Sequence, residues 1–365
     1  MFDRRLVTHF DWPFIATILT LMVVGLLTVY SSNALATSAF RKSLHVRQLT
    51  WIGIGLVGML VTCLVSYRSL GRFAYVFFGA TVFLLAVVLV IGKTGLGAQR
   101  WIRVGGLAFQ PSEFAKLGLV FFLARYFDDH REHLRDAKTM ILPAALTGLC
   151  MLLVLKQPDL GTALLLGFIS LGMMLMVGLD WRRLLPFVVG GGLVAPVLWS
   201  VLKPYQKRRI LVFLDPEMDP LGAGYHIAQS KIAVGSGGLF GKGWLEASQS
   251  QLNFLPLNHT DFIFAVLAEQ WGFLGSLVIL VLYFYVISKG FQIAIDCTDL
   301  FAQLLAAGVS TMLAVQVLIN IAMVLGMMPV VGIPLPMLSY GGSSLLVTLL
   351  GIGLLLGIRM RRFMY

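Results

Sequence analysis

Charged residues are scarce in this 365-residue sequence. Asp, Glu, Lys and Arg make up 12% of the chain, whereas a soluble globular domain carries about 25%. Hydrophobic residues make up 58%, and apolar runs recur at close to the roughly 20 residues that a helix needs to cross a bilayer. The composition therefore excludes an ordinary soluble domain.

Cysteine and the familiar catalytic patterns are also largely missing. The three cysteines, Cys63, Cys150 and Cys297, are isolated and form neither a disulfide framework nor a metal knuckle. No Ser-His-Asp order and no pair of glycosidase carboxylates stands out. No small-residue cleavage site follows the first apolar run, so we expect a membrane span there and not a removable signal peptide.

The net charge of +11 does not indicate nucleic acid, because the basic residues are scattered between apolar runs. Anionic lipid headgroups are the better counterpart for such a distribution.

The apolar runs predict an all-α, polytopic integral membrane protein. Lipid leaves a spanning backbone only helices or a closed barrel, and the runs lack the alternation of a barrel. Hydropathy predicts about ten transmembrane helices, with ends uncertain by a few residues. Their approximate ranges are 12–30, 49–66, 73–92, 111–127, 141–155, 162–179, 184–202, 262–288, 303–326 and 343–358.

The distribution of Lys and Arg predicts that both termini are cytoplasmic. One set of short loops is rich in Arg and Lys, and the opposite short loops hold few; the long 203–261 loop is discounted because long loops are weak topological determinants. This orientation places 93–112, 203–261 and 327–342 on the outer face, where glycine and proline concentrate. The interpretation is a single membrane domain over residues 1–365, with a large extracytoplasmic loop, about 203–261, between the seventh and eighth spans.

A single carboxylate, Asp261, lies in the segment LNFLPLNHTDFIFAVLAEQWG (252–272), where a polar loop enters a long apolar helix. Acidic side chains at membrane depth are costly and mark functional sites. Helix capping remains the alternative role for Asp261, as it is the favoured role for Asp159 in KQPDLGT. A carboxylate among cations suits a single displacement, in which it accepts a proton while the cations stabilise a departing phosphate.

The outer segments supply candidate partners for a charged substrate. Glu113 and Lys116 lie three apart on one helix face and can form an ion pair, either as a structural feature or as the wall of a substrate cavity. The run 203–222 predicts a short interfacial helix, whose cations anchor to headgroups or hold a pyrophosphate. The full set of candidate substrate-binding residues is Arg100, Arg103, Glu113, Lys116, Lys207, Arg208, Lys231, Lys242 and His259.

The glycines of GYHIAQSKIAVGSGGLFGKGW (224–244) match neither a P-loop nor a dinucleotide fingerprint. We expect them to let the backbone turn sharply and approach a ligand or a helix closely. His226 and His259 have no metal-ligand spacing with Asp261. A hard divalent cation such as Mg²⁺, shared between a carboxylate and a pyrophosphate, stays open, and no metal ligands are assigned.

Several long motifs in fixed order resemble the SEDS family (shape, elongation, division and sporulation) over almost the whole chain. They are GAQRWIRVGGLAFQPSEFAK (97–116), KQPDLGT (156–162), LDPEMDPLGAGYHIAQSKIAVGSGGLFGKGW (214–244), FLPLNHTDFIFAVLAEQWG (254–272) and PVVGIPLPMLSYGGSS (329–344). Leu257 and Gln270 depart from the family, which often has Glu at these positions.

The resemblance implies a glycosyltransferase that polymerises lipid II into peptidoglycan strands on the outer face of the cytoplasmic membrane. It implies Asp261 as the essential residue, acting on the acceptor hydroxyl, with inversion and release of undecaprenyl pyrophosphate. It also implies a class B penicillin-binding transpeptidase and other elongation-complex membrane proteins as partners. The short tails favour an elongation role over a division role. A lipid II flippase and a scaffold that recruits the transpeptidase remain alternatives.

Overall fold

The structure is a computed structural model, and it is mostly helical. It describes residues 11–34, 38–95, 98–104, 107–134, 136–178, 200, 204–215, 218–219, 222–251, 254–255 and 257–362. The helices are α2 (Trp12–Ser32), α3 (Ala39–Lys42), α4 (Leu44–Leu64), α5 (Tyr67–Arg72), α6 (Ala74–Ile91), α7 (Pro111–Asp129), the 3-10 helix η1 (Arg131–His133), α8 (Ala137–Lys156), α9 (Leu160–Met176), α11 (Pro204–Leu214), α12 (Ala223–Ser236), α13 (Ser248–Gln251), α14 (Ile263–Ile295), α15 (Leu300–Val324) and α16 (Gly342–Arg361).

Within the described ranges, 6 helices are long and apolar enough to cross a membrane, namely α2, α4, α8, α14, α15 and α16. Two shorter apolar helices lie at Ala74–Val90 and Leu160–Met176. The prediction of a polytopic helical membrane protein is confirmed. The number of spans, the side of the termini and the single domain over 1–365 stay predictions, and most of the predicted 184–202 span lies outside the described residues.

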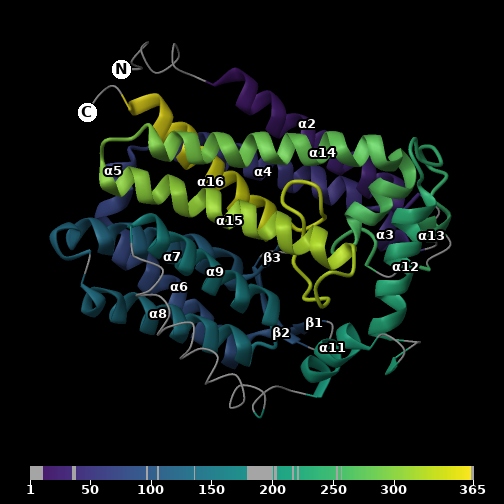
Figure 1. The fold of residues 1–365 in the computed structure, drawn as a ribbon, viewed down its shortest axis with the longest axis horizontal. Helices are drawn as coiled ribbons and strands as arrows, with labels where there is room; N and C mark the ends of the chain where they lie inside the picture. Colours follow the sequence, from purple (N-terminus) through teal and green to yellow (C-terminus); the bar gives the residue numbers. More distant parts are fainter. Residues whose placement is uncertain are drawn as a thin grey trace. The chain divides into compact units, whose positions relative to one another are not determined.

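The described chain forms two compact units. Unit 1 comprises 1–62, 209–289 and 313–356, and unit 2 comprises 63–208, 290–312 and 357–365. In unit 2, α7 packs against α6, α8 and α9 (Figure 1). Most of α7 is buried, which shields its charged residues Glu113 and Lys116 from lipid.

A small antiparallel sheet follows α6 in unit 2, and the sequence analysis did not predict it. Strands β1 (Lys93–Gly95), β2 (Ala98–Val104) and β3 (Leu107–Phe109) pair in the order β1-β2-β3. The register places Lys93 opposite Trp101 and Ile102 opposite Phe109. Two of the strands have only 3 residues, too few for alternation to be recognised.

In unit 1, glycines allow close contacts between segments that are distant in sequence. A Cβ on Gly25 of α2 would lie 2.6 Å from the Met337 carbonyl oxygen, and a Cβ on Gly353 of α16 would lie 2.4 Å from the Met59 carbonyl oxygen of α4. The helix α2 therefore packs against the segment that follows α15, and α4 packs against α16. The loop before α16 lies beside the turn before α14, where the Tyr340 N–H donates to the His259 carbonyl at 2.9 Å.

Candidate functional site

The turn at residues 257–262 leads directly into α14 and carries Asp261. It begins at Leu257, whose φ of 52° is in the left-handed region that bulky residues seldom adopt. The N–H of Thr260 donates to the carbonyl of Leu257 at 3.0 Å. Asp261 is half-buried, whereas residues 262–270, which follow it, are all buried.

The carbonyl oxygens of three consecutive residues of this turn accept hydrogen bonds from the segment 320–340. The pairs are His259 O with the Tyr340 N–H at 2.9 Å, Thr260 O with Ser339 Oγ at 2.6 Å, and Asp261 O with Asn320 Nδ2 at 3.0 Å. We call these three donors the carbonyl cradle. Because a backbone fixed at successive residues has little freedom, the cradle sets the position from which the Asp261 side chain extends.

The donors of the carbonyl cradle are themselves fixed by further hydrogen bonds. Asn320 Nδ2 also donates to the Ile333 carbonyl at 2.7 Å, and Ser339 Oγ accepts from the Leu335 N–H at 2.8 Å. Gln48 Nε2 donates to the Ser339 carbonyl at 3.2 Å. Asn320, Ser339 and Gln48 are all buried, so the network is shielded from water and holds one geometry.

Asn258 extends the network to the first helices of unit 1. Its Nδ2 donates to the Ser32 carbonyl at 3.2 Å, and its Oδ1 accepts from Arg41 at 3.1 Å. The same oxygen lies 3.2 Å from His259 Nδ1. Every residue from Asn258 to Asp261 is thus held by a hydrogen bond from or to a distant segment.

His259 is a neutral member of this site at physiological pH. Burial and, to a smaller extent, the nearby Arg41 charge lower the pKa of His259 to about 4. The contact with Asn258 Oδ1 is a hydrogen bond when the neutral ring carries its proton on Nδ1. His259 is therefore suited to orient a polar group, and it does not add a positive charge for an anionic substrate.

The Asp261 carboxylate faces the backbone of Gly332, in the loop between α15 and α16. A Cβ on Gly332 would lie 3.5 Å from Asp261 Oδ2, and the φ of Gly332 is 74°. Glycine at this position leaves space next to the carboxylate. An acceptor hydroxyl must come within about 2.6–3.2 Å of a general base. A residue without a side chain beside Asp261 does not obstruct such an approach.

In unit 2, the side chain of Arg100 in β2 binds the turn between α8 and α9. Its Nε donates to the Gln157 carbonyl at 3.0 Å, a second nitrogen donates to the Pro158 carbonyl, and NH1 lies 3.8 Å from Asp159 Oδ2. Asp159 caps α9 by accepting from the Thr162 N–H at 3.2 Å, which confirms its predicted capping role. Arg100 thus joins the sheet to the start of α9.

Glu113 and Lys116 form the predicted ion pair in the first turns of α7. Lys116 Nζ lies 2.6 Å from Glu113 Oε2, and the two residues are 2% and 4% exposed. A buried ion pair needs both partners, since either charge alone would be left unpaired. The pair has the properties of a structural element, and its role as a cavity wall stays a prediction.

The remaining candidates belong to other elements. The backbone of Arg103 pairs with Ala108 between β2 and β3, and its side chain lies outside the described part. Lys207 and Arg208 are on α11, and Lys231 is an exposed residue of α12. Lys242 Nζ donates to Glu269 Oε1 at 2.7 Å.

The structure brings only some candidates together. Glu113 and Lys116 contact each other, and His259 and Asp261 share one turn. The unit 2 candidates are Arg100, Arg103, Glu113, Lys116, Lys207 and Arg208, and the unit 1 candidates are Lys231, Lys242, His259 and Asp261.

Sequence reasoning missed Arg41, Asn320 and Ser339. A usable signal was present for Asn320, because an amide side chain inside the apolar 303–326 run is costly unless it has a partner. Ser339 lies in the conspicuous LSYGGSS segment.

Among the described residues, no group of three or more His, Cys, Asp and Glu side chains is placed to hold a metal ion. A divalent cation at Asp261 therefore stays a prediction, and we assign no step to it.

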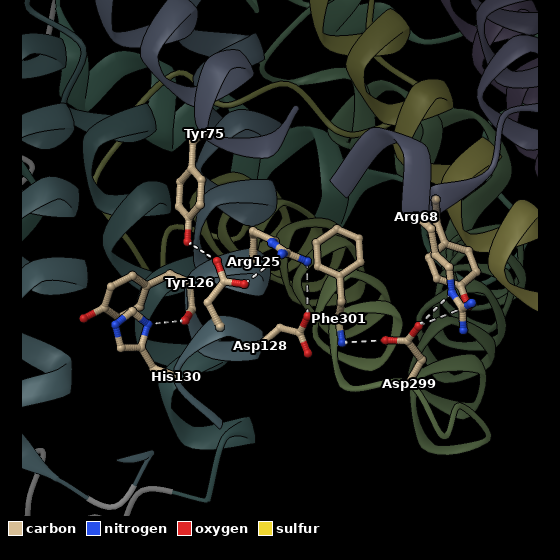
Figure 2. Close-up of polar contacts among 10 residues, drawn as sticks. Arg68, Tyr75, Arg125, Tyr126, Asp128, His130, Asp299 and Phe301 are labelled. Carbon is tan, nitrogen blue, oxygen red and sulfur yellow. Dashed lines mark hydrogen bonds and ion pairs between the residues drawn. The ribbon is translucent and has the colours of Figure 1, made fainter. Parts of the chain in front are cut away.

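A second polar cluster lies in unit 2, at ends of α5, α6, α7 and α15 (Figure 2). Arg125 contacts Asp128 at 3.4 Å and Asp129 at 2.8 Å, and Tyr75 donates to Asp129 at 2.6 Å. Arg68 contacts Asp299 at 3.4 Å. Asp299 also accepts from the Phe301 N–H at 3.1 Å and so caps the start of α15. We call this set the helix-end cluster.

A sequence model of the family described as "Cell cycle protein", which covers FtsW, RodA and SpoVE, matches residues 11–363. The chain belongs to this family. The resemblance to the SEDS family is thereby confirmed, and the apolar helices are those of an integral membrane protein.

Members of this family provide close relatives over the full length. The chain is 41% identical over 366 residues to the peptidoglycan glycosyltransferase MrdB of Escherichia coli K12, with 98% of this chain and 95% of the relative covered. The solved rod shape determining protein RodA of Thermus thermophilus has a TM-score of 0.71 and 34% identity, covering 97% of this chain and 98% of that chain.

A further solved structure is described as the structural coordination of polymerization and crosslinking by a peptidoglycan synthase complex. One of its chains has a TM-score of 0.82 and 36% identity, covering 98% of this chain and 99% of that chain.

Proposed function

We propose that the protein is a peptidoglycan glycosyltransferase of the cytoplasmic membrane, which polymerises lipid II into glycan strands during cell elongation. Its 41% identity to MrdB over 98% of the chain supports the activity. The observation that carries the assignment of the site is the fixed turn 257–262, in which each carbonyl from His259 to Asp261 accepts a hydrogen bond.

Asp261 acts as the general base. Its carboxylate accepts the proton of the GlcNAc 4-hydroxyl of an acceptor lipid II, and the oxygen attacks the anomeric carbon of MurNAc on the donor. The new C–O bond forms as the bond to undecaprenyl pyrophosphate breaks, and its electron pair leaves with the pyrophosphate. Attack from the face opposite the leaving group inverts the anomeric carbon. Gly332 has no side chain beside the Asp261 carboxylate, which supports an approach of the acceptor from this side.

Cations stabilise the charge on the departing pyrophosphate. Lys116 and Lys242 each form an ion pair with a buried glutamate, which favours a structural role for both lysines. The other predicted cations, Arg100, Arg103, Lys207, Arg208 and Lys231, stay candidates for contacts with the leaving group. If a divalent cation takes part, Asp261 would supply an oxygen ligand, and the cation would neutralise charge on the departing pyrophosphate.

The topology that suits this chemistry has about ten spans, cytoplasmic termini and Asp261 on the outer face. A class B penicillin-binding transpeptidase is the proposed partner, which the relation to a chain of a peptidoglycan synthase complex supports. Other membrane proteins of the elongation machinery complete the assembly.

Purified protein and labelled lipid II test the proposal, with and without the transpeptidase. We expect the wild type to form polymer and Asp261→Asn to form none, because the amide does not accept the proton. Asp299→Asn is the matched control, since it neutralises an aspartate of the helix-end cluster and should polymerise normally. Both variants should unfold at a temperature close to that of the wild type.

Four outcomes would contradict the proposal. Polymer from a folded Asp261→Asn protein excludes the general base. Loss of folding in that variant assigns Asp261 to helix capping. Translocation of labelled lipid II across vesicles without polymer would support the flippase alternative, and neither activity would support the scaffold.

A further inference from the structure

Helix α14 is broken near its beginning. Gly272 has a φ of 66° and a ψ of −163°, far from helical values, so the 33-residue element consists of a first half, 263–271, and a second half, 273–295. A break leaves N–H and C=O groups without helical partners, and such groups are costly at membrane depth unless the protein supplies partners.

A glycine-rich turn, residues 237–243, supplies those partners. Two N–H groups after the break donate to carbonyls of the turn, and two N–H groups of the turn donate to carbonyls before the break. The four pairs are Phe273 N with Gly238 O (2.8 Å), Leu274 N with Leu239 O (3.1 Å), Lys242 N with Glu269 O (3.0 Å) and Gly243 N with Gln270 O (3.1 Å). The turn therefore bridges the two halves of the helix.

The contact is so close that it requires glycine. A Cβ on Gly241 would lie 2.1 Å from the Gln270 carbonyl oxygen, and a Cβ on Gly272 would lie 2.3 Å from the Gly241 nitrogen. A Cβ on Gly237 would lie 2.1 Å from the Ala268 carbonyl oxygen. Real Cβ atoms do not approach backbone atoms this closely, so a side chain at these positions would push the turn out of the break.

A buried carboxylate fastens the same turn. Glu269 is 0% exposed, and its Oε1 accepts from Lys242 Nζ at 2.7 Å, Ser248 Oγ at 3.1 Å and the Gln249 N–H at 3.2 Å. Lys242 Nζ also contacts Ser248 Oγ at 3.1 Å. The Lys242 ammonium thus has two partners within the protein, and the chain on both sides of it is tied to α14.

The two halves of α14 have different surroundings. Residues 262–270 are all buried, whereas Phe273 and Leu274 are 58% and 46% exposed. The first half is surrounded by protein, and the second half presents apolar side chains to lipid. The break lies where one environment gives way to the other, and Asp261 lies just before the first half.

We propose that the turn 237–243 is a splint that fixes the first half of α14, and with it Asp261, in the geometry for catalysis. Lys242 and Glu269 are positioning residues of this splint, and Lys242 does not bind the departing pyrophosphate. This inference rests on the proposed function. A displacement of about 1 Å in a catalytic group costs about 100-fold in rate, so a loosened splint lowers kcat.

Two glycines of the turn provide a matched pair of variants. Gly241 and Gly238 both have positive φ, 82° and 55°, but a Cβ on Gly238 has no neighbour within 4 Å among the described atoms. We expect Gly241→Ala to lower kcat for polymerisation by about tenfold or more. Its KM for lipid II should stay within about twofold, and Gly238→Ala should change both constants by less than about twofold.

A double-mutant cycle tests the role of Lys242. If the turn is a splint, Lys242→Met and Glu269→Gln each lower kcat and leave KM unchanged. The kcat of the double variant is then no lower than that of the less active single variant. Lys242→Arg keeps the ion pair and should restore most of the activity. If Gly241→Ala does not fold, this cycle decides the matter.

A loss of kcat or a rise in KM for lipid II in Lys242→Met that Glu269→Gln does not share would make Lys242 a substrate ligand and overturn the inference. Equal activity of Gly241→Ala and Gly238→Ala would overturn it as well. Both outcomes differ from a failure of the proposed function, in which the wild type itself forms no polymer.

Discussion

The helix-end cluster and the carbonyl cradle fix helix ends and a turn by different means. The helix-end cluster uses charged partners (Figure 2). Its Arg68 and Asp299 side chains are 47% and 26% exposed. The carbonyl cradle uses neutral donors, and Asn320 and Ser339 are 0% and 3% exposed. The helix-end cluster is therefore partly exposed, and the carbonyl cradle is buried.

The difference bears on how an aspartate is held ready for chemistry. Exposed ion pairs contribute about 0–1 kcal/mol and are screened by salt. Losing a buried hydrogen-bond donor leaves its acceptor unsatisfied and costs about 1–3 kcal/mol. The cradle holds the main chain of Asp261 through its carbonyl oxygen, whereas Asp129 and Asp299 hold their helix ends through their carboxylates.

The largest effect is expected at the ion pair that is sealed from water. Glu113→Leu leaves Lys116 buried without its carboxylate and should lower the unfolding free energy by about 3–5 kcal/mol. Glu113→Leu combined with Lys116→Met should recover most of this loss. Thermal unfolding in detergent measures both, and no recovery in the double variant would show that the pair is not mainly structural. Activity of the recovered double variant then tests the predicted cavity-wall role.

The carbonyl cradle is tested at Asn320, with Gln316 as its control one helical turn earlier. Asn320→Ala removes the donor to the Asp261 and Ile333 carbonyls and should lower polymerisation by about 10- to 100-fold. Gln316 is also fully buried, but both of its amide atoms lack a partner in the described part. Gln316→Leu should therefore keep activity and keep or raise stability. Similar losses in the two variants would refute the cradle.

His259 makes the stability of the folded protein sensitive to acid. An unfolded histidine has a pKa of about 6.5, whereas that of His259 is lowered to about 4. As the pH falls, His259 binds a proton in the unfolded chain before it does so in the folded protein. The free energy of unfolding that is present above pH 6.5 therefore decreases between pH 6.5 and about pH 4, by up to about 3 kcal/mol. His259→Gln should remove this part of the decline in melting temperature, and equal declines in both proteins would contradict the assignment.

The smallest effect is expected in the helix-end cluster. Arg68→Gln removes an exposed ion pair with Asp299 and should cost less than about 1 kcal/mol. The loss should shrink further in 1 M salt, where the Debye length is about 3 Å. Melting temperatures at low and high salt measure it. A large loss of stability that does not depend on salt would contradict the difference between the helix-end cluster and the carbonyl cradle.

The helices and one backbone feature could be predicted from the sequence. Apolar length alone located α2, α14, α15 and α16 to within several residues. The glycines at 237–243 were expected to permit a close approach to a helix, and the contacts of Gly237 and Gly241 with α14 confirm this. The spacing of Glu113 and Lys116 predicted their ion pair, since neighbours on a helix meet by geometry alone.

The carbonyl cradle could not be predicted, because its partners are distant in sequence. Asn320 is 59 residues from Asp261, and Ser339 is 79 residues from Thr260. No periodicity relates such positions, and only packing of α15 and its loop brings them to the turn. The sheet at 93–109 was missed for a different reason, since its strands are too short to leave a pattern.

Gly332 has a consequence for any molecule meant to reach Asp261. With no side chain of its own, this residue presents bare backbone beside the carboxylate, and its φ of 74° resists replacement by larger residues. A ligand that hydrogen-bonds the Asp261 oxygen while lying flat on this bare backbone would occupy ground that the bacterium cannot easily cover by mutation. Gly332 is thus the position where resistance to such a ligand would be hardest to acquire.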